Sequence, residues 1–159
     1  MSINLKALAK FLIEAKTKGG YGFGKEIKPW RKGFKELEYR KGNFYYRDSY
    51  SGHFFAPGQE VVYYKNKPVW AMAYSGGMNF KYHGNAKFAL EVFGFLRKAL
   101  AKMPLSKPFR GPAKLKIGDF VYTSKLAGNI KDFSGIEKIN YKGKEVFKQY
   151  YIGGLIVHK

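Results

Sequence analysis

Two short segments in the middle of the chain alternate in side-chain character with the two-residue period of a β-strand. They cover residues 58–64 and 68–74, and the polar tripeptide Lys65-Asn66-Lys67 joins them. Two strand-like runs separated by a short polar turn predict an antiparallel β-hairpin. In the second run the two faces carry Trp70, Met72 and Tyr74 on one side and Val69, Ala71 and Ala73 on the other. We expect the face of small residues to take a closely packed helix.

Two amphipathic segments flank the β-rich parts of the chain. Residues 3–17 and 86–102 carry apolar side chains at three- and four-residue spacing, which predicts two helices. Ser2 or Asn4 can cap the first helix, and Asn85 can cap the second. Gly19-Gly20 predicts a left-handed stop to the first helix.

The remaining strand-like runs complete a prediction of the fold. Residues 20–43 lack a clear period and are expected to form a long loop, with at most short strands near Phe34 and Tyr39. The strands are expected at residues 44–50, 59–65, 68–75, 114–124, 133–140 and 145–157. We therefore predict an α+β fold with an antiparallel β-sheet of about six strands and two main helices packed on it. The chain shows no linker or repeat, so residues 1–159 are expected to form a single domain.

Composition excludes several classes of protein. The chain has no cysteine, 45% hydrophobic residues and no apolar run long enough to span a membrane. Disulfide frameworks and thiolate metal sites are therefore excluded, and a disordered chain is disfavoured. The amino-terminal residues lack the features of a signal peptide, so a cytoplasmic protein without a membrane partner is expected.

The formal net charge of +19 predicts attraction to polyanions. Only five of the 30 basic residues are arginine, and lysine is poorly suited to bidentate reading of bases. The charge therefore favours either weak, non-specific nucleic-acid binding or a lysine coat with no binding role. Residues 48–80 carry no net charge and eight aromatic residues, which makes this stretch the better place for a specific site.

Two patterns that resemble functional motifs fail on their context. Residues 19–25 fit the first seven positions of a phosphate-binding P-loop, but Glu26 stands where Ser or Thr is required and a helix precedes the glycines. The three histidines, His53, His83 and His158, are far apart in the sequence, so no metal site is expected. We accordingly predict no cofactor.

Carboxylates are scarce, and three of them lie in aromatic strand segments: Asp48, Glu60 and Glu137. A carboxylate on an aromatic face can have a raised pKa and act as an acid or a base. The alternative is a carboxylate paired with Arg47, Arg110 or a lysine, or hydrogen-bonded to tyrosine hydroxyls. We favour the paired alternative.

Six short strings of the sequence lie at residues 46–52, 58–62, 68–76, 109–112, 133–137 and 151–154. Together they resemble an uncharacterised domain family whose members stand alone or follow a Cro/repressor-type helix-turn-helix domain in predicted transcriptional regulators. The resemblance implies a ligand- or partner-binding module and no known activity; Ala73 and Phe109 depart from the Asn and Tyr of the family pattern.

The most favoured function is a non-catalytic domain that binds a small ligand or a protein partner. The expected binding residues are Tyr46, Asp48, Tyr50, Glu60, Trp70, Tyr74, Arg110 and Glu137, with Trp70 as a partly buried wall. One alternative is a small hydrolase or transferase with Glu60 or Glu137 as general acid or base. The other is a non-specific nucleic-acid-binding protein.

Overall fold

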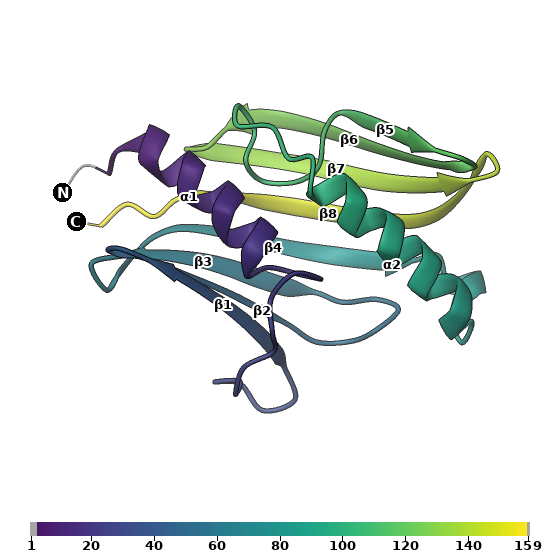
Figure 1. Cartoon of the computed structure of the whole chain (residues 1–159), viewed down its shortest axis with the longest axis horizontal. Helices are drawn as coiled ribbons and strands as arrows, with labels where there is room; N and C mark the ends of the chain where they lie inside the picture. The colour runs from purple at the N-terminus through teal and green to yellow at the C-terminus, as the bar shows by residue number, and fades with distance from the viewer. Residues whose placement is uncertain (1–2, 159) are drawn as a thin grey trace.

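Eight antiparallel strands form one continuous sheet in the computed structural model, which describes residues 3–158. The spatial order of the strands is β1-β2-β3-β4-β8-β7-β6-β5 (Figure 1). The strands are β1 (Lys35–Lys41), β2 (Phe44–Tyr50), β3 (Gly58–Tyr64), β4 (Lys67–Met78), β5 (Lys114–Ile117), β6 (Phe120–Asn129), β7 (Asp132–Tyr141) and β8 (Lys144–Leu155). The α+β class and the antiparallel pairing are confirmed, but the number of strands is not.

The prediction of about six strands is wrong in two places. β1 lies within the segment that was expected to be mainly loop. The sequence did not indicate the full length of this strand, because it is largely charged and its one aliphatic side chain, Leu37, gives no apolar alternation. The strand expected at residues 114–124 is two strands, β5 and β6. They are separated by a tight turn in which Gly118 adopts a left-handed backbone conformation, with φ of 58°.

Both helices cover the same face of the sheet (Figure 1). They are α1 (Leu5–Lys18) and α2 (Ala86–Leu100), and a short 3₁₀ turn, η1 (Phe80–Tyr82), precedes α2. The side chain of Asn4 accepts a hydrogen bond from the amide of Ala7, and that of Asn85 accepts one from Phe88. These contacts satisfy amide groups that the first helical turn leaves without partners. No helix in the described part of the chain is long and apolar enough to cross a membrane.

The face of β4 that meets the helices is the one with large side chains. Trp70 and Met72 are fully buried and pack with Leu8 and Leu12 of α1. Ala73, on the other side of the strand, is exposed. The expectation that the small face takes a helix is therefore wrong: large side chains fill the space beneath α1, and the small residues lie on the uncovered side.

The stop expected at Gly19-Gly20 also differs from the structure. Gly19 caps α1 with φ of −119°, which is not left-handed. A Cβ at this position would lie 2.6 Å from the Cβ of Tyr39 and 2.7 Å from the carbonyl oxygen of Glu38. Glycine is thus required because the end of the helix approaches β1 closely.

Two apolar clusters fill the space between the helices and the sheet. The cluster beneath α1 includes Leu8, Phe11, Leu12, Val62, Trp70, Met72, Phe109 and Phe133. The cluster beneath α2 includes Val92, Phe95, Leu96, Tyr122, Ile139 and Phe147. Each helix therefore has its own core, and the two cores are separate clusters.

Trp70 provides a test of the α1 core. Trp70→Ala should lower the free energy of unfolding by about 3–5 kcal/mol, because it removes a wholly buried ring stacked on Phe133. Urea denaturation at constant pH measures this change. Trp30→Ala is the matched control, since Trp30 is 67% exposed and contacts mainly Arg47; its loss should cost about 1 kcal/mol. Equal losses for the two variants would contradict the assignment of Trp70 to the core.

Candidate functional site

A cavity of about 340 Å³ lies between the two helices on the covered face of the sheet; we call it the interhelical cavity. Its walls come from the loop after α1, from α2, from strands β1, β2, β4 and β8, from residues 52–56 and from Arg110. Most of the lining side chains are aromatic or aliphatic. The charged ones are Glu26, Lys35, Asp48, Arg97 and Arg110, and Tyr21, Tyr50 and Tyr74 are among the aromatic ones.

Arg110 and Glu137 form the central contact of a buried ionic network behind the cavity. The Nη2 atom of Arg110 lies 2.5 Å from Oε1 of Glu137, and its Nε atom lies 3.1 Å from both carboxylate oxygens. The hydroxyl of Tyr122 donates to Oε2 of Glu137 at 2.6 Å. Burial and the charge of Glu137 raise the pKa of Tyr122 well above its usual value, so this phenol stays protonated as a donor.

Lys16 and Glu60 form a second buried ion pair. Lys16, in the last turn of α1, places its Nζ atom 2.5 Å from Oε2 of Glu60 and donates to the carbonyl oxygen of Phe109 at 2.6 Å. Arg110 Nη1 lies 4.0 Å from Oε1 of the same glutamate. Burial lowers the pKa of Lys16, and the negative charge of Glu60 opposes that effect. The pair anchors α1 to both β3 and the segment at Phe109.

Asp48 differs from the other buried carboxylates because it has no cationic partner. It is 2% exposed, and its Oδ1 atom accepts a hydrogen bond of 2.7 Å from the hydroxyl of Tyr74. Among residues 3–158, no lysine, arginine or histidine nitrogen lies within ion-pair distance of its carboxylate. Burial, together with the nearby charge of Glu60, raises the pKa of Asp48 to about 7.

The structure divides the residues expected from the sequence into three groups. Asp48, Tyr50, Tyr74 and Arg110 line the interhelical cavity. Glu60, Glu137 and Tyr46 lie behind it in the buried network and its surroundings. Trp70 is wholly buried in the α1 core, so the expectation of a partly buried wall is wrong.

The placement of Glu60 and Glu137 favours the paired alternative over the acid–base one. Glu60 is 3% exposed, Glu137 is fully buried, and each forms an ion pair with a basic residue. Neither lines the interhelical cavity. Arg47, expected as a possible partner for these carboxylates, instead pairs with Glu36 on the uncovered face of the sheet and stacks on Trp30.

Sequence reasoning did not find the cavity residues contributed by α2 and by the loop after α1. Phe93 and Leu96 look like ordinary core positions of an amphipathic helix. The glycine-rich string, set aside as a P-loop, forms part of the cavity wall through Tyr21, Gly22 and Gly24. Gly22 has φ of 79°, and a Cβ there would collide with the side chain of Arg97 at 1.8 Å. The glycines thus allow the loop to pass close to α2.

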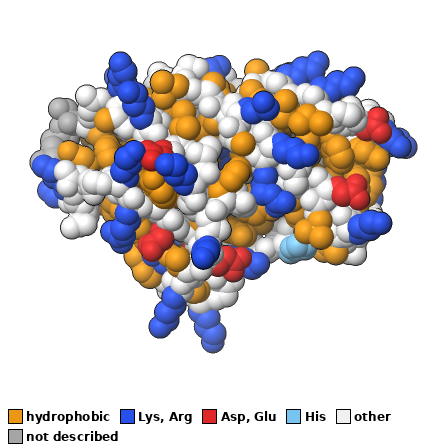
Figure 2. Space-filling view, in the orientation of Figure 1, with side chains coloured by type: hydrophobic (Ala, Val, Ile, Leu, Met, Phe, Trp, Pro, Cys, Tyr) orange, Lys and Arg blue, Asp and Glu red, His pale blue; other side chains and the backbone are white. Residues whose placement is uncertain are grey.

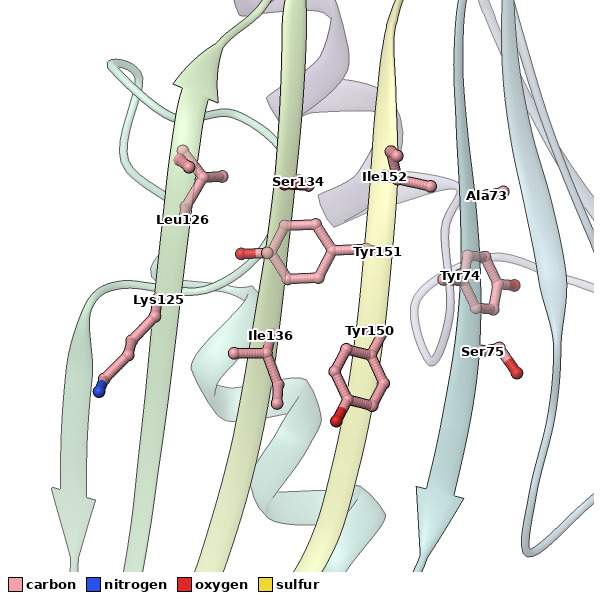
Figure 3. Close-up of a pocket in the computed structure, with 12 residues that line it drawn as sticks. Ala73, Tyr74, Ser75, Lys125, Leu126, Ser134, Ile136, Tyr150, Tyr151 and Ile152 are labelled. Atoms are coloured by element: carbon pink, nitrogen blue, oxygen red, sulfur yellow. The ribbon is translucent and has the colours of Figure 1, made fainter.

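A shallow groove of about 700 Å³ lies on the uncovered face of the sheet (Figure 3). Tyr150 and Ile152 of β8 are 55% and 61% exposed, with Ile136 of β7 and Lys125 of β6 beside them. The groove contains neither a buried charge nor a residue expected to bind, apart from Tyr74 of β4. Within residues 3–158, no group of three or more His, Asp or Glu side chains is placed to hold a metal ion.

The fold and the cavity define an α+β protein with two helices on one face of an antiparallel sheet. Residues 48–156 match the family described as "Domain of unknown function (DUF5680)", and the chain belongs to this family. No curated protein and no solved structure matches the chain significantly. The matched region includes Asp48, Tyr74 and Arg110, whereas α1 and β1 precede it.

The raised pKa of Asp48 predicts a pH dependence of stability. From its ordinary pKa of 3.8 up to about 7, the folded protein retains a proton that the unfolded chain has released. This residue therefore makes the fold less stable as pH rises through that window, by up to about 1.4 kcal/mol per pH unit. The asparagine of Asp48→Asn cannot titrate. The free energy of unfolding of this variant, relative to that of the native protein, should therefore increase from pH 4 to pH 7 and be constant above pH 7.

Urea denaturation at a series of pH values measures the difference. Glu26→Gln is the control, because Glu26 also lines the cavity but its side chain is 55% exposed. The contribution of Glu14, whose pKa is lowered to about 2 mainly by hydrogen bonds from Lys18 and Lys41, is common to all three proteins and cancels. Parallel stability curves for the native protein and Asp48→Asn would contradict the raised pKa.

Proposed function

We propose that this protein is a non-catalytic binding domain that takes a small ligand in the interhelical cavity. The observation that carries the proposal is the arrangement of Asp48 and Tyr74 at a cavity otherwise lined mainly by aromatic and aliphatic side chains. Small-molecule sites are typically concave, mostly apolar, about 300–1,000 Å³ in volume, and supplied with a few convergent polar groups. The cavity has each of these properties.

The buried ion pairs support a binding role over a catalytic one. Glu60 and Glu137 are held by Lys16 and Arg110, which leaves them as structural supports of the cavity rather than free acids or bases. Asp48 accepts one side-chain hydrogen bond, from the hydroxyl of Tyr74, and the amine of Lys16 near it is already paired with Glu60. We extend the proposal to the role that the sequence resemblance implies, a ligand-binding module that accompanies DNA-binding domains in regulators.

Three probes of similar size and different charge test for binding in the cavity: benzamidine, benzyl alcohol and benzoate. We expect at least one to shift the backbone amide resonances of Gly76, Gly77 and Leu96, which line the cavity, in a protein-observed NMR titration. Amides of Ala127 and Ile136, in the groove on the opposite face, serve as an internal control. Shifts confined to that groove, or none with any probe, would contradict the proposed function.

A second candidate function is weak nucleic-acid binding by the helix-covered face. Basic side chains are spread over this face with apolar and acidic groups between them (Figure 2). Two basic residues of the helices do not contribute to it, because Lys16 is buried and Arg97 lines the cavity. The exposed lysines on the helices are Lys6, Lys10, Lys18, Lys87 and Lys98, and Lys102 follows α2.

We expect measurable, sequence-independent binding to duplex DNA at low salt that weakens steeply as salt is added. Each phosphate contact contributes about 0.9 to the slope of log K against log salt. The triple variant Lys6→Glu, Lys10→Glu, Lys18→Glu should reduce the slope in a fluorescence anisotropy titration. The variant Lys114→Glu, Lys116→Glu, Lys125→Glu makes the same change in net charge at β5 and β6. Equal effects of the two variants would show that net charge alone, and not the helix face, attracts the DNA.

A further inference from the structure

The charges buried between the helices and the sheet balance while Asp48 holds its proton, but above its pKa of about 7 the ionised carboxylate has no partner. Two cations, Lys16 and Arg110, face three carboxylates, and each cation is within 2.5 Å of a glutamate. Tyr46, Tyr74 and Tyr122 add no charge, because burial raises their pKa values well above the usual range. Asp48 is therefore the one carboxylate of this group whose negative charge is left uncompensated.

The hydrogen bonding of Asp48 is also incomplete. An ionised carboxylate can accept about four hydrogen bonds. Asp48 accepts one side-chain hydrogen bond, from Tyr74, and its side chain lines the interhelical cavity. A desolvated carboxylate with free acceptor capacity gains most from a charged donor, since hydrogen bonds between ionised groups are stronger than neutral ones. The cavity is the direction from which such a donor can come.

The walls around Asp48 define the remainder of the ligand. Tyr21 and Tyr50 meet edge to face, with ring centroids 6.1 Å apart, and Phe54 and Phe93 line the same cavity. Such walls suit a flat apolar group, whose burial and ring packing both favour binding. Arg97 lies on the α2 side and has no ion pair among the described residues, so an anionic ligand drawn to this arginine is the competing possibility.

We propose that the interhelical cavity selects ligands that carry a protonated nitrogen, an amine or an amidine, on a flat apolar body, and that Asp48 binds the nitrogen. The proposal rests on the proposed function, since it specifies the ligand class of the same cavity. It follows from the charge count: Arg110 is already paired with Glu137, Lys16 with Glu60, and Asp48 with no cation.

The relative affinities of the three probes distinguish a cavity that selects cations from one that selects anions. Benzamidine should bind at least tenfold more tightly than benzyl alcohol at pH 8, because a charge-assisted hydrogen bond to a buried carboxylate forms only with the cation. Benzoate should bind more weakly than either. If benzyl alcohol or benzoate binds as tightly as benzamidine, the cavity still binds ligands but the cationic class is wrong. If none of the three binds there, the proposed function fails as well.

Two further measurements test whether Asp48 is the group that binds the cation. Lowering the pH from 8 to 6 should weaken benzamidine binding about tenfold, because the proton competes with the ligand for a carboxylate whose pKa is about 7. The groups that face Asp48 and set this pKa are Glu60, Lys16, Arg110 and Tyr74. Benzamidine itself stays protonated throughout this range.

Asp48→Asn should weaken benzamidine binding at pH 8 at least tenfold and abolish its pH dependence, while benzyl alcohol binding changes little. Glu91→Gln, at an exposed carboxylate of α2 outside the cavity lining, should leave both affinities within about twofold. The asparagine retains an oxygen to accept the Tyr74 hydrogen bond, and a dispersed NMR spectrum shows that the variant is folded. Unchanged benzamidine affinity in Asp48→Asn, or a pH-independent affinity in the native protein, would overturn the proposal.

Discussion

The ion pair between Arg110 and Glu137 is the contact on which the arrangement of the cavity depends. Glu137 is fully buried in the middle of β7, where an unpaired carboxylate would be strongly unfavourable. Arg110 compensates it through three hydrogen-bond contacts and thereby fixes the segment that follows α2 over the sheet. The same segment provides the carbonyl of Phe109 to Lys16, and so it connects α2 to α1.

This linkage explains why the cavity lies where it does. Lys16 is at the carboxyl end of α1, and its ion pair with Glu60 holds that end above β3. The loop from Gly19 to Gly24 must then leave the helix close to both β1 and Arg97, which its glycines allow. The two apolar cores fill the space directly beneath each helix, and the cavity beside them keeps a few polar side chains in mainly apolar walls.

The elements that the sequence predicted well are those with strong local signals. The hairpin of β3 and β4, the hairpin of β7 and β8, and both helices with their asparagine caps lie within a few residues of the expected positions. β1 was expected only as a short strand near Tyr39, because an edge strand that pairs on one side only can be highly charged, as Lys35–Lys41 is. Its register with β2 is fixed by the two-residue turn at Gly42-Asn43, where Lys41 pairs with Phe44 and Gly42 has φ of 56°.

The residues of the candidate site also divide into those with a local signal in the sequence and those without one. Asp48, Tyr74 and Arg110 could be singled out because polar side chains are unusual in aromatic strands and in a Pro/Gly-rich loop. The cavity residues of α2 could not be singled out, since a leucine that lines a cavity and a leucine that fills a core have the same spacing along a helix. Which face of β4 meets the helices was also undecidable from periodicity, because alternation gives two faces without saying which is covered.

The three buried carboxylates of the covered face differ in their partners: two are ion-paired and one is not. Glu137 and Glu60 are close to Arg110 and Lys16, and their charges are neutralised where they lie. Asp48 is as deeply buried and has no ion-pair partner among the described residues. Natural folds keep such locally unfavourable groups mainly where they serve a function. The uncompensated carboxylate at the cavity wall is therefore the observation that favours the proposed binding site over a space left by packing.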